Sequence, residues 1–155
     1  MATDAKSMER LSGLHPSIRE AAIRAYTKAC KITPVGVHPY ITETYRSFKR
    51  SDELYAQGRT KPGAIVSNAK GGQSIHNYYL ALDFVLMING KMSWNVDDNW
   101  KKVVKCFEEE GFEWGGTWKF KDYPHFQKTN GYSLKQIQEK YKNGDFMDGD
   151  KYLNL

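Results

Sequence analysis

Residues 71–90 of the chain read GGQSIHNYYLALDFVLMING. The first half of this stretch is polar and rich in glycine, whereas residues 79–88 form one of the most apolar runs in the sequence and predict a strand in the core. Asp83 lies inside the apolar run, and His76 lies at the junction of the two halves. Because burying an unpaired polar group costs about 2–7 kcal/mol, the carboxylate of Asp83 needs a compensating partner.

The flanking segments predict a mixture of helices and short strands. Apolar spacing, capping residues and glycine or proline breakers predict helices over residues 15–32, 48–57, 96–110 and 133–142 and strands over residues 37–44, 79–88 and 123–127. Asn89 and Gly90 suit a tight hairpin turn. This order of elements predicts an α+β fold in which a small, mainly antiparallel sheet is flanked by helices.

The length of 155 residues predicts a single domain over residues 1–155, with its core over about 14–142. Residues 1–13 look like a loose lead-in, and the tail after residue 142 shows no clear periodicity. Cys30 and Cys106 are expected to be reduced thiols in the core. There is no apolar run long enough to predict a membrane span, and the N-terminus lacks the apolar region of a signal peptide.

The chain is basic, with 23 Lys and Arg against 18 Asp and Glu, a net charge of +5. A basic surface favours anionic partners such as nucleic acid, anionic lipid or acidic wall polymers. The basic residues are scattered rather than aligned on one helix, and no nucleic-acid motif is present, so we do not expect nucleic-acid binding.

Two of the four histidines lie beside carboxylates. His76 precedes Asp83 by seven residues, and His125 follows Asp122 by three. Two imidazoles and one carboxylate, with a fourth position open to water, are the ligands of a catalytic zinc site, and a further carboxylate can serve as general base. His15 and His38 each precede a proline, which favours surface or turn positions.

Taken separately, these spacings are common. A satisfied core histidine and a solvated loop aspartate would give the same pattern. Arg46 follows a predicted strand and precedes a helix cap, so it is either an ordinary surface arginine or a guanidinium aimed at a substrate carboxylate or a developing oxyanion.

Several segments together resemble a known family. SIHNYYLALDF resembles the S-x-H-x6-D signature of the VanX/VanY-type zinc D-Ala-D-Ala metallopeptidases, and DYPHF resembles their second signature. The segments YRS, LYAQGRT and SNAKGGQSIHN are similar to the L-alanyl-D-glutamate endopeptidase branch, which includes phage endolysins and CwlK-like wall hydrolases. The resemblance covers about residues 40–127 and implies the hedgehog/D-Ala-D-Ala peptidase-like fold.

The resemblance implies a zinc peptidase, with one zinc ion per chain, that cuts the L-Ala–D-Glu bond of peptidoglycan stem peptides. The roles that it implies are zinc ligands His76, Asp83 and His125, general base Asp122, transition-state arginine Arg46, and substrate-binding residues Ser74, Gln57 and Trp114. Relatives often carry glycine at the position of Tyr79, which could narrow the groove or pack outward.

Two other functions fit the same residues. One is a D,D-carboxypeptidase or dipeptidase on the same zinc site, and the other is a non-catalytic zinc-containing domain that binds the cell wall. We expect a monomer whose partner is bacterial peptidoglycan. Without a signal peptide or an added wall-binding module, it would act in the periplasm or cell wall as a bacteriolytic enzyme, after phage-type release or injection, with its charge aiding wall binding.

Overall fold

The computed structural model describes residues 2–149 and 151–155. Within these residues the chain forms five α-helices, two short 3-10 helices and one five-stranded sheet. The elements are α1 (Ala5–Ser12), α2 (Pro16–Ile32), β1 (Val37–Glu43), α3 (Phe48–Ala56), η1 (Ile75–Tyr78), β2 (Ala81–Ile88), β3 (Lys91–Ser93), α4 (Asp98–Glu109), β4 (Glu113–Trp114), η2 (Gly115–Thr117), β5 (His125–Gln127) and α5 (Leu134–Lys142). The predicted α+β fold is confirmed.

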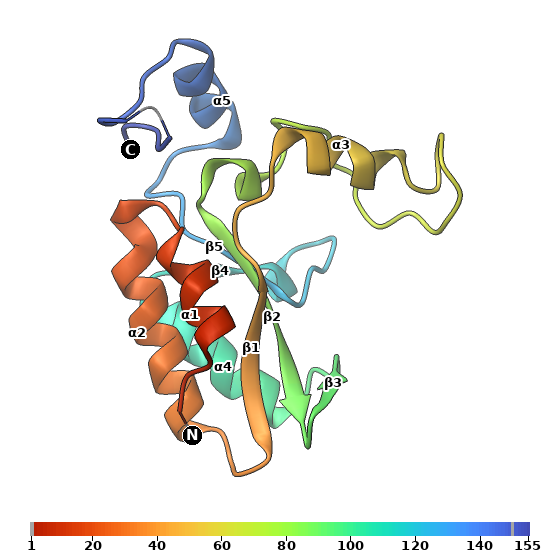
Figure 1. Ribbon diagram of the computed structural model, residues 1–155, viewed down its shortest axis with the longest axis vertical. Coiled ribbons are helices and arrows are strands. Elements are labelled where there is room, and N and C mark those ends of the chain that lie inside the picture. Colours follow the sequence, from red (N-terminus) through yellow and green to blue (C-terminus); the bar gives the residue numbers. More distant parts are fainter. Residues whose placement is uncertain (1, 150) are drawn as a thin grey trace.

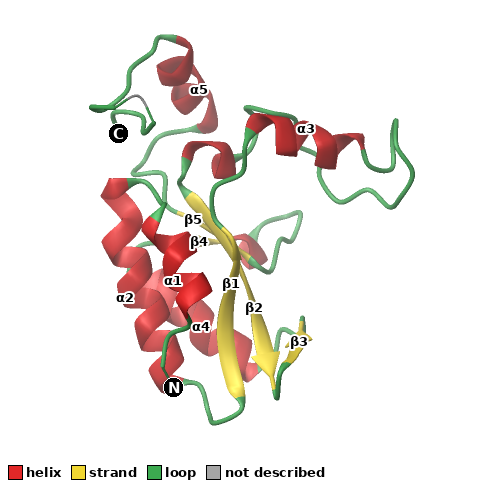
Figure 2. Ribbon diagram, in the orientation of Figure 1, coloured by secondary structure: helices red, strands yellow, loops and turns green. Residues whose placement is uncertain are grey.

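β2 is the strand on which the sheet is built. The strand order is β1-β2-β5-β4, β3 pairs with the end of β2, and every pairing is antiparallel (Figure 2). Asn89 and Gly90 both have positive φ and join β2 to β3, as the sequence predicts. Asp83 on β2 lies opposite Glu43 on β1 and opposite His125 on β5. The register of the sheet therefore gathers three chemically active residues at one point.

The helices α1, α2 and α4 gather on one side of the sheet (Figure 1). Alternate residues of β2, including Leu82 and Phe84, are fully buried against them. Phe84 packs on Phe126, with ring centroids 5.4 Å apart, and on Trp100, with centroids 4.3 Å apart. Because successive side chains of a strand point to opposite faces, Asp83 faces away from this core. An apolar strand can thus carry a carboxylate without placing it among the aromatic rings.

The N-terminal segment is not the loose lead-in that we expected. It contains α1, whose N-cap Asp4 accepts hydrogen bonds from the Ser7 amide and from the Tyr26 hydroxyl, the latter at 2.6 Å. Asp4 also lies 2.7 Å from Nε2 of His38, which is partly buried in β1 rather than in a surface turn. These bonds link the N-terminus to α2 and to the sheet.

His15 was also expected at the surface, and this prediction is wrong. It is the N-cap of α2 and is completely buried. Its Nε2 lies 2.6 Å from the backbone oxygen of Leu153, whose side chain is also buried. The tail is therefore docked on the start of α2 despite its lack of periodicity. Cys30 and Cys106 are both buried, in agreement with the prediction.

Replacing Asp4 with asparagine should destabilise the fold in a pH-dependent way. Burial raises the pKa of Asp4, but hydrogen bonds from Tyr26 and His38 outweigh it and lower the pKa to about 2. The folded state thus favours the ionised form of Asp4. This preference contributes about 2 kcal/mol to the free energy of unfolding. The contribution is complete above the ordinary pKa near 4 and is lost as the pH falls through about 2. Denaturant unfolding of Asp4→Asn should show this loss at pH 7. The exposed control Asp148→Asn should match the parent, and equal stability of Asp4→Asn and parent at pH 7 would contradict the role.

Candidate metal centre

An open cleft of about 820 Å³ lies where β2 and β5 meet the connections around them. Its lining includes Asp83 from β2 and His125 and Gln127 from β5. Further lining residues come from the loops at 66–69 and 118–122. The cleft therefore combines rigid strand residues with loop residues that a substrate could contact, which is typical of catalytic sites.

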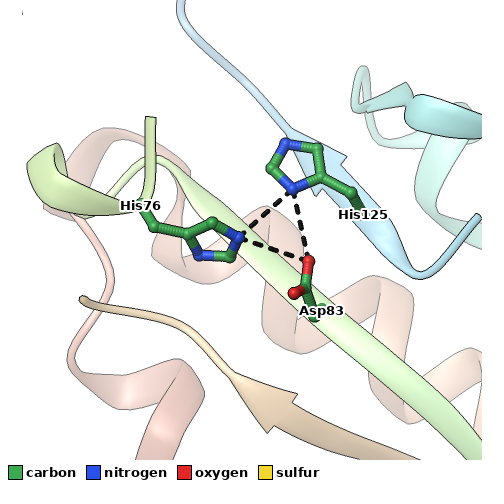
Figure 3. Close-up of side chains that lie close together, drawn as sticks. All are labelled: His76, Asp83 and His125. Carbon is green, nitrogen blue, oxygen red and sulfur yellow. Dashed lines mark hydrogen bonds and ion pairs between the residues drawn. The ribbon is translucent and has the colours of Figure 1, made fainter. Parts of the chain in front are cut away.

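Three side chains converge in this cleft. Nε2 of His76 lies 3.3 Å from Oδ1 of Asp83, and Nδ1 of His125 lies 3.2 Å from the same oxygen. The two imidazole nitrogens are themselves 3.2 Å apart. Figure 3 shows the side chains pointing toward one another from η1, β2 and β5. One donor atom from each thus lies within 4.8 Å of the others, close enough to hold a single metal ion.

The remaining ring nitrogens show that this donor set fits a metal. Nδ1 of His76 lies 2.7 Å from the backbone oxygen of Thr44, which can only accept, so this nitrogen donates. Nε2 of His125 lies 2.8 Å from Oε1 of Gln127 and donates in the same way. In neutral rings the two converging nitrogens are then lone-pair donors facing a carboxylate. Such an arrangement needs a cation between the donors, and hydrogen bonds to the outer nitrogens are usual for metal-binding histidines.

The electrostatics of the cluster favour the same conclusion. Burial raises the pKa of Asp83, but when the rings of His125 and His76 are protonated their hydrogen bonds to the carboxylate outweigh burial and hold the pKa well below its ordinary value. A bound cation would take the place of these protons. Burial lowers the pKa of His125, but the Asp83 carboxylate outweighs it and raises the pKa. The cluster therefore keeps an ionised carboxylate and attracts positive charge. This is the compensation that a carboxylate in an apolar strand requires.

Two local devices position His76. Ser74 caps η1 by accepting a hydrogen bond from the His76 amide, and Asn77 completes the capping box. The buried Asn77 also donates from Nδ2 to the backbone oxygen of Arg46, at 2.9 Å. Ser74 lines the cleft, as expected of a substrate-binding residue. Asn77 was not predicted, although its place three residues after a capping serine is a signal for this motif.

Asp122 and Arg46 are brought into the same cleft. Oδ2 of Asp122 is 3.9 Å from Nδ1 of His125, and half of its side-chain surface is exposed. Burial of the rest raises the pKa of Asp122. The guanidinium of Arg46 donates twice to the carboxylate of Glu43, at 2.6 and 2.8 Å, and only 12% of its side chain is exposed. Arg46 is therefore held in place by Glu43 rather than free in solvent.

Gln57 and Trp114 are not among the residues that line the cleft. The Gln57 amide donates to the backbone oxygen of Ala64, and the Trp114 indole donates to that of Tyr123. Both side chains shape loops, so the geometry does not support the prediction that they bind substrate. Sequence reasoning missed Gln127, although its spacing of two from His125 on one strand indicates a shared face.

Tyr79 packs outside the metal cleft. Its φ of 64° is in the left-handed region, which glycine adopts far more readily than tyrosine. The ring stacks on Tyr45, with centroids 4.1 Å apart, and lines a separate pocket of about 360 Å³ beside Tyr141. Of the two alternatives for Tyr79, the structure therefore favours outward packing over a narrowed groove.

Fold and site together define the class of metallopeptidases with a His–Asp–His cluster. A family model described as D-alanyl-D-alanine carboxypeptidase matches residues 67–128. The peptidoglycan L-alanyl-D-glutamate endopeptidase CwlK of Bacillus subtilis (strain 168) is 45% identical over 126 residues, which cover 75% of this chain and 74% of CwlK. The chain belongs to the D-Ala-D-Ala metallopeptidase family.

The fold has a solved counterpart. The crystal structure of the Serratia marcescens L-Ala D-Glu endopeptidase ChiX matches with a TM-score of 0.58 and 30% sequence identity. The match covers 83% of this chain and 90% of ChiX. The family resemblance seen in the sequence is thus confirmed by both sequence and fold.

Replacing Gln127 with leucine should weaken zinc binding by about 10–100-fold, because the outer hydrogen bond that orients His125 is lost. Competition with a chromophoric zinc chelator measures this change. Gln57→Leu is the matched control, since Gln57 lies outside the cleft, and it should bind zinc like the parent. Unchanged zinc affinity in Gln127→Leu would contradict the orienting role.

Proposed function

We propose that the protein is a zinc-dependent endopeptidase that cuts the L-Ala–D-Glu bond of peptidoglycan stem peptides. The observation that carries this proposal is the convergence of His76, Asp83 and His125 on the wall of an open cleft, with the carboxylate of Asp122 3.9 Å from His125. The names of CwlK and ChiX, which are both L-Ala–D-Glu endopeptidases, support the choice of bond.

His76, Asp83 and His125 would hold the metal. A zinc ion bound there supplies Lewis acidity, which acidifies water and polarises a carbonyl group. Asp122 would remove a proton from the attacking water and return it to the leaving amine. The raised pKa of Asp122 suits this exchange, because a general base works best when its pKa approaches the working pH.

Arg46 would stabilise negative charge on the scissile carbonyl oxygen. Its guanidinium lines the cleft, and the two hydrogen bonds to Glu43 fix its orientation before substrate arrives. A preorganised charge of this kind costs no reorganisation during the reaction. Ser74, which lines the cleft and caps η1 beside His76, is the further candidate for substrate contact.

The proposal includes the setting in which the enzyme acts. Peptidoglycan lies outside the cytoplasm, so the protein would reach it by phage-type release or injection and act as a bacteriolytic monomer. Among the residues that the structure describes, no helix combines the length and apolar character needed to cross a membrane. The net charge of +5 is complementary to acidic wall polymers.

Replacing Arg46 with alanine should lower kcat by about 10²–10³-fold and leave zinc bound, because a charge that acts in the transition state is lost while the metal ligands remain. Steady-state hydrolysis and zinc analysis of the same sample measure the two quantities. Arg50→Ala, at an exposed arginine of α3, is the matched control and should keep the parent rate. A parent-like rate in Arg46→Ala would refute the role.

Digestion of purified peptidoglycan should identify the bond by mass spectrometry of the released peptides. We expect new L-Ala C-termini and D-Glu N-termini, and their loss when a chelator removes the metal. Release of free D-Ala would instead support the carboxypeptidase function, which the description of the matching family model favours. No cleavage with any divalent metal would support a non-catalytic wall-binding domain.

A further inference from the structure

The cationic side chains of the cleft differ in whether a carboxylate of the protein neutralises their positive charge. Arg46 and Lys121 both line the cleft. The guanidinium of Arg46 is paired with the carboxylate of Glu43. Lys121, by contrast, has no salt-bridge partner among residues 2–149 and 151–155, and it is exposed. Lys121 therefore offers the cleft a positive charge that is available to a ligand.

The position of Lys121 relates this charge to the chemistry of the cleft. Lys121 directly precedes Asp122, in the segment between η2 and β5, several of whose residues line the cleft. The Asp122 amide donates to the backbone oxygen of Gly115, which ties this segment to η2. A ligand group bound by Lys121 would thus lie close to the group that serves as general base.

The proposed substrate has a carboxylate at this place. In a stem peptide the chain continues from D-Glu through its γ-carboxyl group, so the α-carboxylate is free. This carboxylate is attached to the carbon that carries the leaving nitrogen, only two bonds from it. Asp122 is negatively charged before it takes the proton of the water and again after it has given that proton to the nitrogen, and in these states two negative groups lie within a few ångströms of each other. Their repulsion would oppose productive binding unless a cation lies beside them.

We propose that Lys121 binds the free α-carboxylate of D-Glu and makes the enzyme prefer D-glutamate to its α-amide, D-isoglutamine. This inference rests on the proposed function and adds a specificity-determining residue to it. Arg46 is less suited to the role, because its Nε and Nη2 already bind Glu43 and its remaining donors would serve the scissile carbonyl oxygen. An ammonium group on a flexible stem can follow a carboxylate whose position shifts during the reaction.

Two synthetic peptides test the proposal. One is N-acetyl-L-alanyl-γ-D-glutamyl-L-lysine, and the other is the same peptide with the α-carboxylate of D-Glu converted to an amide. The ratio of kcat/KM for the acid to that for the amide is measured for the zinc-loaded enzyme. The parent should prefer the acid. Lys121→Met keeps the length of the stem without the charge and should lower the ratio by about tenfold or more, chiefly through KM for the acid. Lys121→Arg should restore most of the preference.

Lys119→Met is the matched control. Lys119 is exposed in the same segment but does not line the cleft, so this variant should keep the parent ratio. An unchanged ratio in Lys121→Met, or an equal fall in Lys119→Met, would overturn the proposal. If the parent cuts both peptides equally well, the endopeptidase function stands and the role of Lys121 fails. If the parent cuts neither peptide at the L-Ala–D-Glu bond, the proposed function itself fails.

Discussion

The carboxylate of Asp83 is the group on which the rest of the site depends. Its strand is apolar on the face that packs against the helices, and antiparallel pairing with β5 places His125 directly opposite. His76 arrives from η1 and completes the cluster. The energetic cost of a carboxylate in this strand is offset by the two imidazoles and by the cation that the three groups would hold. Asp83 is therefore both part of the central strand and part of the candidate metal centre.

The carboxylates of the cleft differ in how they are paired. Asp83 lies against the two imidazoles, Glu43 forms an ion pair with Arg46, and Asp122 is partly exposed near His125. Each of the first two carboxylates has a fixed partner, which preorganises the groups that need to be rigid. Within the described part of the chain, Asp122 and Lys121 lack such a fixed partner, and we propose that they act on the substrate together with the oriented guanidinium of Arg46. Because some charges are paired and others are available, one small cleft can bind a substrate, polarise its carbonyl group and transfer protons.

Much of the fold could be predicted from local patterns, because α2, α4 and β2 have strong apolar periodicity. The residues brought together at the metal centre were also predicted, through the family signatures rather than through their spacing. The helix α1 was missed because its stability comes from bonds between Asp4 and residues 22 and 34 positions away. Glu43 was missed because its place opposite Asp83 depends on strand register and on a bulge that no local pattern reveals. Gln127 was missed although its spacing of two from His125 was a local signal.

We propose that His76, Asp83 and His125 hold the metal that peptide cleavage requires. A crystal of the zinc-loaded protein, measured on both sides of the zinc absorption edge, is the most direct test of this metal site. We expect one strong anomalous peak at about 2.0–2.2 Å from Nε2 of His76, a carboxylate oxygen of Asp83 and Nδ1 of His125. Zinc bound only elsewhere on the chain, or no stoichiometric zinc in a protein that still cleaves peptidoglycan after chelation, would contradict it.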